Sequence, residues 1–260
     1  MTIDFESAVD FSMATPGELQ PFDILYLDDD IVAIDKPAGF HVHQPENPRR
    51  RVARELTVLW ALRQQIDKWL YPVHRIDVGT EGVLLFALNK PSAAHLCQQF
   101  QQNRIRKTYF AIVRGYTNDI GEINLPLELD STGELVSACT HYVTHSRVEL
   151  PWAVGKRHNT ARYSLVEVKP ETGRYHQIRR HMARISHPLI GDREHGDSHH
   201  NRFFRLDLSA PGLWLKAKRL SFQHPSQGRE INLTSHWSKR WMEVCDKLHL
   251  VIPAEGRTHF

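Results

Sequence analysis

The chain has 260 residues, of which 41% are hydrophobic and 24% charged, so an ordinary globular core can form. Its longest apolar runs are about strand length, well short of the roughly 20 residues that a membrane helix needs. Three widely spaced cysteines without a CxxC pair argue against a zinc ribbon or a disulfide framework, and they suit a reducing cytoplasm. Residues 1–20 contain four acids and no lysine or arginine, which predicts an acidic N-terminal extension that is no signal peptide, ahead of a single domain over 21–250.

The formal net charge is only +3, but the charges are unevenly distributed along the chain. Residues 155–184 hold eight Lys or Arg against two Glu, and smaller basic clusters occupy 49–54 and 104–107. A single charge run is most often a solvated face. Three runs beside the most motif-like segments favour a polyanionic partner.

The first half of the chain alternates strand and helix signals. Residues 23–39 contain two apolar runs around an Asp-rich turn, which predicts a hairpin. Apolar residues at helical spacing predict a helix over 52–68, and the apolar run 82–89 predicts a buried strand. Pro91 is suited to the first turn of a helix that continues to about Asn103.

The second half is richer in strands. We expect strands at 107–115, 161–170, 213–222 and 229–234, with helices at 174–186 and 237–249. Residues 115–160 have a weak pattern that is typical of an insertion. Because the helices follow the strands at irregular intervals, the sequence favours an α+β fold with a mainly antiparallel mixed sheet over a doubly wound parallel one.

Asp77 is the first candidate for chemistry. It lies in HRIDVGTEG (residues 74–82), after a basic pair and before two glycines, which we expect to let the backbone turn and bring a ligand close. An isolated Asp in such a turn more often caps backbone N–H groups. Beside arginines, however, an acid keeps a low pKa and stays a carboxylate, which can act as a nucleophile or a proton acceptor.

The predicted helix 174–186 offers a partner for this carboxylate. Ile178 and Met182 belong to its apolar stripe, and Arg179 lies on the shoulder of that stripe. A guanidinium placed there can grip a carboxylate with two hydrogen bonds, although an ordinary helix-flank charge fits the pattern equally well. Arg180 and Arg184 point away from the stripe, toward solvent or phosphate.

Tyr109 lies in the predicted strand 107–115, where a tyrosine usually packs in the core or at its rim. Next to basic clusters it could instead stack on a base, a contact worth about 1–3 kcal/mol in single-stranded nucleic-acid sites. His176, His181 and the HGDSHH run (195–200) suggest metal ligands, but no HExxH or Cys/His spacing supports them, and we expect no metal. No Walker loop or GxGxxG is present, so we expect no nucleotide cofactor.

Several ordered motifs resemble those of the RluA-type pseudouridine synthases, over most of residues 22–235. HRIDVGTEG resembles the family's His-Arg-Leu-Asp-x-x-Thr-Ser-Gly motif, and DKPAGFHVH (35–43) its Asn-Lys-Pro segment. KTYFAIVRG (107–115), TGRYHQIRRHMARISHPLIGD (172–192) and LSFQHP (220–225) resemble three further family segments. The chain departs from the pattern at Glu81, Asp35 and Lys216, where the family usually has Ser, Asn and His.

The resemblance implies an isomerase that breaks the glycosidic bond of a flipped uridine, turns the uracil and rejoins it through carbon-5, without cofactor or metal. Asp77 would be the catalytic aspartate, Arg179 its partner, and Tyr109 would pack on the uracil and is a candidate base. Arg75 would replace the flipped uridine in the RNA stack. The remaining RNA-binding candidates are His74, Arg157, Arg174, Arg180 and Arg184.

Within the family the chain is most similar to the branch that acts in the T-arm region of tRNA. Ribosomal RNA is the alternative substrate, and an inactive RNA-binding protein or a metal-dependent RNA hydrolase are the alternative functions. The presence of the Asp–Tyr–Arg set disfavours the inactive protein, and full activity in EDTA would exclude the hydrolase. We expect a cytoplasmic enzyme that acts as a monomer on RNA, without membrane contact.

Overall fold

The first hairpin forms where the sequence predicts it, in a computed structural model that describes residues 21–45, 51–129, 132–155 and 158–254. Strands β1 (Asp23–Leu27) and β2 (Ile31–Lys36) pair antiparallel. Between them, the Asp28 carboxylate accepts hydrogen bonds from the backbone N–H groups of Asp30 and Ile31, at 2.8 and 2.9 Å, which closes the turn. The predicted acidic extension, residues 1–20, lies outside the described residues.

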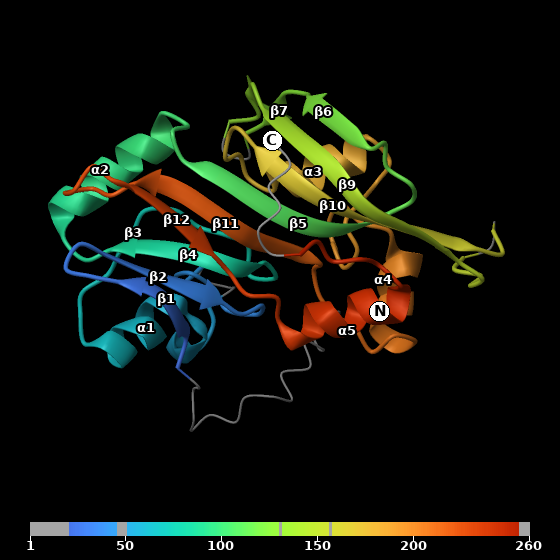
Figure 1. Ribbon diagram of the computed structural model, residues 1–260, viewed down its shortest axis with the longest axis horizontal. Helices are drawn as coiled ribbons and strands as arrows, with labels where there is room; N and C mark the ends of the chain where they lie inside the picture. Colours follow the sequence, from blue (N-terminus) through green and yellow to red (C-terminus); the bar gives the residue numbers. More distant parts are fainter. Residues whose placement is uncertain (1–20, 46–50, 130–131, 156–157, 255–260) are drawn as a thin grey trace, which may run out of the picture.

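The hairpin forms one edge of a large twisted sheet that runs the length of the molecule (Figure 1). In the described residues the sheet has ten strands, in the order β1-β2-β4-β11-β5-β10-β9-β6, with β12 on β11 and β3 on β4. Their pairs are antiparallel, except that β4 and β11 run parallel. The further strands of this sheet are β3 (Tyr71–Pro72), β4 (Glu81–Ala87), β5 (Arg106–Arg114), β6 (Ile120–Asn124), β9 (Cys139–Leu150), β10 (Ala161–Pro170), β11 (Leu215–Gln223) and β12 (Glu230–Thr234). Outside it, β7 (Leu127–Glu128) pairs with β8 (Leu135–Val136) as a separate two-stranded sheet.

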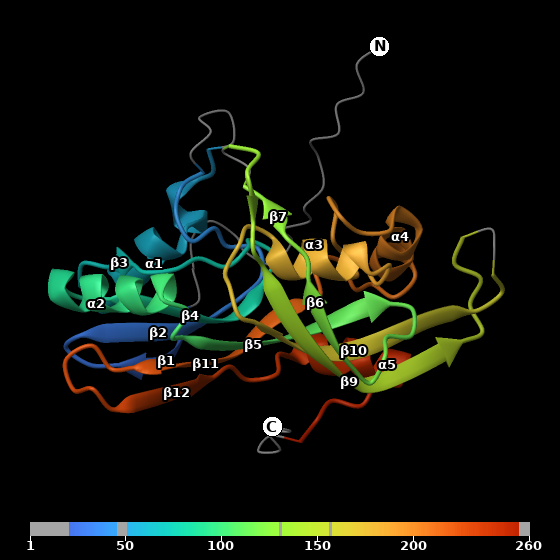
Figure 2. The same ribbon diagram turned by 90° about the horizontal axis from the view of Figure 1, so that it is seen from above.

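Helices cover both faces of this sheet. The helices are α1 (Val58–Ile66), α2 (Lys90–Gln101), α3 (Gln177–Arg184), α4 (Ser198–Leu206) and α5 (Lys239–Leu248), with a short 3-10 helix at Arg54–Leu56. Ile178 of α3 packs among alternate residues of β5 and β10 such as Val113 and Val166, whereas Trp241 of α5 packs among the intervening ones such as Ile112. Helices α3 and α5 therefore lie on opposite faces, as Figure 2 shows. This arrangement confirms the predicted α+β class.

Two expectations about the first 160 residues need correction. The helix predicted over 52–68 begins only at Val58, because the chain before it pairs with His41, whose carbonyl accepts the Val58 N–H at 2.8 Å. Residues 115–160 are no insertion: β6 and β9 extend the main sheet, and β9 pairs with β10 over its whole length. Their weak apolar pattern reflects a position at the sheet edge, where polar side chains face solvent.

The second half differs from expectation at two places. The helix predicted over 174–186 is shorter, because His176 adopts a left-handed backbone (φ 50°) that ends the preceding loop, and α3 starts at Gln177. The histidine-rich run contains the start of an unpredicted helix, α4, which Asp197 caps by accepting hydrogen bonds from the backbone N–H groups of His199 and His200. In the described part of the chain, no helix is long and apolar enough to cross a bilayer.

Candidate active site

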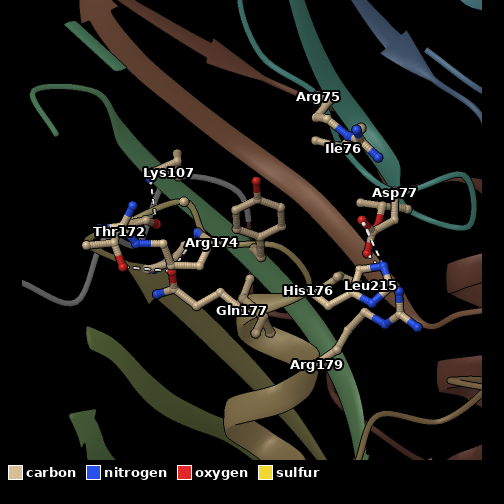
Figure 3. A pocket seen from close by; sticks show the side chains of 15 residues that line it. Arg75, Ile76, Asp77, Lys107, Thr172, Arg174, His176, Gln177, Arg179 and Leu215 are labelled. Carbon is tan, nitrogen blue, oxygen red and sulfur yellow. Dashed lines mark hydrogen bonds and ion pairs between the residues drawn. The ribbon is translucent and has the colours of Figure 1, made fainter. Parts of the chain in front are cut away.

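A pocket of about 110 Å³ opens where the start of β4, the strands β5 and β11, and the loop before α3 meet (Figure 3). Asp77 and Arg179 lie on one side of it, and Lys107 and Thr172 on the other. The loop before α3 is held by the buried Gln177, whose carboxamide oxygen accepts hydrogen bonds from the Thr172 hydroxyl and the Arg174 N–H, at 2.7 and 3.0 Å. The lower wall of the pocket is thus fixed before any ligand enters.

The loop that carries Asp77 is anchored by a buried lysine. Lys36 lies at the end of β2 and its Nζ donates hydrogen bonds to the carbonyls of Pro37, Phe40 and Val78, at 2.9, 3.1 and 3.2 Å. Burial lowers the pKa of this ammonium to about 7, while the carboxylates of Glu81 and Asp77 act in the opposite direction. Through these three hydrogen bonds Lys36 ties the DKPAG segment to the loop that carries Asp77.

The two glycines at the end of this loop and the start of β4 make room for neighbouring protein atoms. Gly82 has φ +116°, and a Cβ there would lie 2.1 Å from the Ala217 carbonyl oxygen of β11. A Cβ on Gly79 would lie 2.9 Å from the Cβ of Leu213. The sequence predicted that these glycines bring a ligand close. In the fold, both are required because β11 and the segment before it pass directly against the loop, and the close approach of a ligand stays a prediction.

Arg179 connects two carboxylates. Its Nε and Nη2 donate to the two oxygens of Asp192, at 2.8 and 2.7 Å, and its Nη1 donates to Asp77 Oδ2 at 3.2 Å. The Asp192 side chain is fully buried and that of Arg179 is 8% exposed, whereas Asp77 is 25% exposed and faces the pocket. Hydrogen bonds from Arg179 help to keep the pKa of Asp192 below its usual value, against the effect of burial. No local pattern in the sequence singles out Asp192, although it ends the segment 172–192 that resembles a family motif.

His176 also borders the Asp77 carboxylate. Its Nε2 lies 3.7 Å from Asp77 Oδ1, and its Nδ1 faces Glu194 Oε2 at 3.4 Å. Burial lowers the pKa of this imidazole, so the ring is mainly neutral near pH 7. His181, a second candidate ligand, is committed elsewhere: its ring nitrogens bond the Thr140 hydroxyl and the Leu125 carbonyl, both at 2.9 Å.

Tyr109 and Lys107 line the pocket from β5. Burial raises the pKa of the Tyr109 phenol, and the Asp77 carboxylate raises it further, so this phenol stays protonated at neutral pH. Its ring is thereby better suited to packing than to proton abstraction. Burial lowers the pKa of Lys107 to about 8, and its Nζ donates a 2.9 Å hydrogen bond to the Thr172 carbonyl.

The model of the family described as RNA pseudouridylate synthase matches residues 30–184. The chain belongs to this family. Over 232 residues it is 42% identical to tRNA pseudouridine synthase C of Pectobacterium carotovorum subsp. carotovorum, a match that covers 85% of this chain and 61% of that protein. It is also 42% identical over 228 residues to tRNA pseudouridine synthase C of Haemophilus ducreyi, covering 84% of this chain and 92% of that one.

A solved structure shows the same fold. Human RNA pseudouridylate synthase domain containing 4 has a TM-score of 0.68 to this chain at 22% identity, and the match covers 89% of this chain and 95% of the human one. The family resemblance drawn from the motifs is therefore confirmed. As an RNA pseudouridylate synthase, the chain is an isomerase that acts on RNA.

The candidate RNA-binding residues of this pseudouridylate synthase fall into different settings. Arg75 is exposed at the pocket and makes no hydrogen bond or ion pair with other described residues. Arg174 also lines the pocket. Arg180 and Arg184 lie outside it, and each donates one hydrogen bond to a backbone carbonyl, of Glu128 and Pro126 respectively.

The two other candidates stand apart. His74 turns its ring inward, where Nε2 accepts the Leu85 N–H at 3.0 Å and the ring stacks on Phe100. Burial lowers the pKa of His74 to about 3, so it carries no charge for a phosphate at neutral pH. His74 therefore has a structural role in this geometry, and its contact with RNA stays a prediction. Arg157 lies outside the described residues.

The three departures from the family motifs meet in one buried cluster. Lys216 Nζ lies 3.6 Å from Asp35 Oδ1 and 3.9 Å from Glu81 Oε2, and its side chain is 1% exposed. Glu81 also pairs with Arg240 at the start of α5 and accepts a 2.8 Å hydrogen bond from Ser238. The changes thus compensate one another, because each buried charge finds an opposite partner. The cluster lies directly after the loop that carries Asp77, at the parallel pair of β4 and β11.

Proposed function

We propose that this pseudouridylate synthase isomerises a uridine in the T-arm region of tRNA. The relatives named tRNA pseudouridine synthase C support the choice of tRNA, and the motif likeness of the sequence supports the T-arm. The observation that carries the mechanism is the Asp77 carboxylate. It faces the pocket while a buried, bidentately held Arg179 keeps one of its oxygens occupied.

The reaction is a rearrangement that needs no oxidant. The bond between N1 of uracil and C1′ of ribose breaks, the uracil turns, and a new bond forms between C5 and C1′. The proton on C5 then leaves, and N1 gains one, so that atoms and electrons balance. Asp77 could attack the sugar, attack the base, or remove a sugar proton. In each case the carboxylate itself is the reacting group, and Arg179 Nη1 fixes its position through the 3.2 Å hydrogen bond to Oδ2.

The other candidate residues orient the RNA. Tyr109 packs its ring against the uracil, and Arg75 enters the space that the flipped uridine leaves in the stack. Flipping costs a few kcal/mol of unstacking, and a flat guanidinium recovers part of that loss by stacking on the neighbouring bases. Arg174, Arg180 and Arg184 contact phosphates, together with Arg157.

We further propose that residues 21–250 act as one catalytic domain, as a monomer in the cytoplasm. The described strands β1 to β12 share one sheet apart from the β7–β8 pair, which supports a single unit. The three cysteines are free thiols, which suits a reducing compartment.

The test compares wild-type protein with Asp77→Asn on unmodified tRNA transcripts, with carbodiimide mapping of pseudouridine and a separate binding assay. Asparagine keeps the size of the side chain but removes its charge and basicity. We expect Asp77→Asn to form no pseudouridine and to bind tRNA nearly as well as wild type. Pseudouridine formation by this variant at a near wild-type rate would overturn the mechanism.

The substrate is tested by the same mapping on total RNA from cells with and without the protein. Loss of a T-arm pseudouridine is the expected result. Loss of a ribosomal site instead would keep the enzyme class and replace the substrate. Unchanged maps together with retained RNA affinity would identify a binding protein that has lost catalysis.

A further inference from the structure

Three groups of potential metal ligands occur among the described residues, and one of them differs from the others. In the Asp28–Asp30–His224 group, Asp28 and His224 already bond each other at 2.7 Å. In the Cys139–His141–Glu171 group, His141 Nε2 bonds Glu171 at 2.8 Å. The third group consists of His176, Glu194 and His195, and two of its nitrogens lack a hydrogen-bond partner.

These two nitrogens are His176 Nδ1 and His195 Nε2, and both are buried. The His176 side chain is only 6% exposed. A buried nitrogen without a partner is costly, since such a group loses its water and gains no hydrogen bond. Both nitrogens face the same Glu194 oxygen, Oε2, at 3.4 Å from His176 and 4.0 Å from His195.

The three ligand atoms lie within 4.8 Å of one another, and one of their distances matches the edge of a small coordination sphere. Ligand atoms at about 2.0–2.1 Å from a tetrahedral zinc ion lie about 3.3–3.4 Å from one another. The pair formed by His176 Nδ1 and Glu194 Oε2 has this separation already. The pair of His195 Nε2 with Glu194 Oε2, at 4.0 Å, needs a shift of about 0.6–0.7 Å, and His195 is partly exposed and near a glycine, Gly196.

The surrounding charge favours a cation. Arg179 is paired with three carboxylates, those of Asp77, Asp192 and Glu194, so this set of four groups carries an excess of negative charge. The N-terminal end of α3 adds a partial positive charge. Two full negative charges outweigh it. Two imidazole nitrogens and one carboxylate oxygen form a ligand set that zinc accepts readily.

We propose that His176 Nδ1, His195 Nε2 and Glu194 Oε2 form a binding site for a divalent transition metal, with Zn²⁺ as the best-fitting ion. The sequence predicted no metal because these ligands lack a recognised spacing. Their approach depends on the left-handed backbone at His176, which turns its ring toward the 192–196 loop. The site goes beyond the proposed function, which uses no metal.

Metal at this site acts on the catalytic carboxylate through His176. When Nδ1 binds the ion, the remaining ring proton must be on Nε2, the atom that lies 3.7 Å from Asp77 Oδ1. The ring then donates toward the oxygen that Arg179 leaves free. With both oxygens engaged, Asp77 is less available to the uridine, so the bound metal inhibits the isomerase.

The direct test measures Zn²⁺ affinity of the purified, metal-free full chain by competition with a chromophoric chelator. We expect His195→Asn to weaken zinc binding by at least the about 10–100-fold that loss of an outer-shell partner costs. His199→Asn is the matched control, because His199 lies in the same histidine-rich run, is 67% exposed and is outside the cluster. Equal zinc affinities of His195→Asn and His199→Asn would overturn the site.

A second variant separates this site from the group that contains a thiol, Cys139–His141–Glu171. Cys139→Ser removes the thiol of the Cys139–His141–Glu171 group and should leave the measured affinity unchanged. Loss of zinc binding in Cys139→Ser with retention in His195→Asn would place the ion at β9 and overturn the proposal.

The functional consequence is tested by pseudouridine formation with and without zinc. We expect zinc to inhibit wild type and EDTA to restore full activity. His195→Asn should turn over like wild type without zinc and resist inhibition. Zinc binding at the site without inhibition would overturn the link to Asp77. If the chain forms no pseudouridine, the proposed function is wrong. The measured zinc affinity would still decide whether the metal site exists.

Discussion

Arg179 holds Asp192 with two hydrogen bonds, at 2.8 and 2.7 Å, and Asp77 with one, at 3.2 Å. Asp192 is fully buried and cannot reach a substrate, whereas Asp77 keeps a quarter of its side chain exposed in the pocket. The arginine is thus fixed by one acid so that it can polarise the other. A bidentate pair sets both the position and the plane of the guanidinium, which determines where Nη1 meets Asp77.

This arrangement predicts a large effect of Asp192→Asn. Removing one member of a buried ion pair typically costs about 3–5 kcal/mol, because the partner charge stays buried. We expect a loss of that size in the free energy of unfolding, measured by denaturant titration, and a lower turnover number. Asp207→Asn, at an exposed aspartate, is the control and should stay within about 0.5 kcal/mol of wild type. A comparably small change for Asp192→Asn would show that the bidentate pair contributes little.

The lowered pKa of the buried Lys36 predicts that the free energy of unfolding depends on pH. Its pKa is about 7 in the folded chain, because of burial, and about 10.4 in an unfolded one. Between these values the unfolded chain binds more protons, so raising the pH stabilises the folded state, and this gain is lost as the pH falls through 7. We expect the unfolding free energy of wild type to rise relative to Lys36→Met from pH 7 to 10.

The control for this experiment is Lys90→Met, at an exposed lysine. The difference in unfolding free energy between wild type and Lys90→Met should be nearly independent of pH. If the wild-type minus Lys36→Met difference is equally flat, the buried lysine keeps an ordinary pKa, and its three carbonyl partners offset the whole cost of burial.

The proposed role of Arg75 predicts that the effect of its substitution on turnover depends on the structure of the RNA. Arg75→Ala should reduce turnover most on a structured stem-loop, where the uridine must leave a stack, and less on a short unstructured strand. The measurement is the ratio of wild-type to mutant turnover on the two substrates. Arg205→Ala, at an exposed arginine outside the pocket, should give the same ratio on both. An equal loss on both substrates for Arg75→Ala would mean that Arg75 positions Asp77 or a phosphate.

The proposed phosphate contact of Arg184 predicts that its substitution changes the salt dependence of RNA affinity. Each phosphate contact contributes about 0.7–0.9 to the slope of log affinity against log salt concentration. We expect Arg184→Gln to flatten the slope by about one such contact while leaving turnover at saturating RNA nearly intact. Arg180→Gln should behave alike, since both side chains lie outside the pocket. An unchanged slope in both variants would remove α3 from the RNA-binding surface.

The sequence determined the elements whose periodicity is local. Strand β10 begins and ends where the alternation of apolar residues does, and α2 begins at Lys90, one residue before the predicted proline, with Asn89 as its cap. The family motifs identified Asp77, Tyr109 and Arg179 as candidates, because matched segments carry these residue types in order. These signals need no knowledge of which segments meet in space.

The tertiary structure alone decided which residues that are distant in the sequence form ion pairs. Asp192 lies 115 residues after Asp77, and the buried cluster joins Asp35, Glu81 and Lys216 from three strands. Likewise, Gly82 is required by the passage of β11, which no local pattern shows. Ion pairing and close packing depend on distances of a few ångströms between segments, and those distances exist only once the sheet order has brought the segments together.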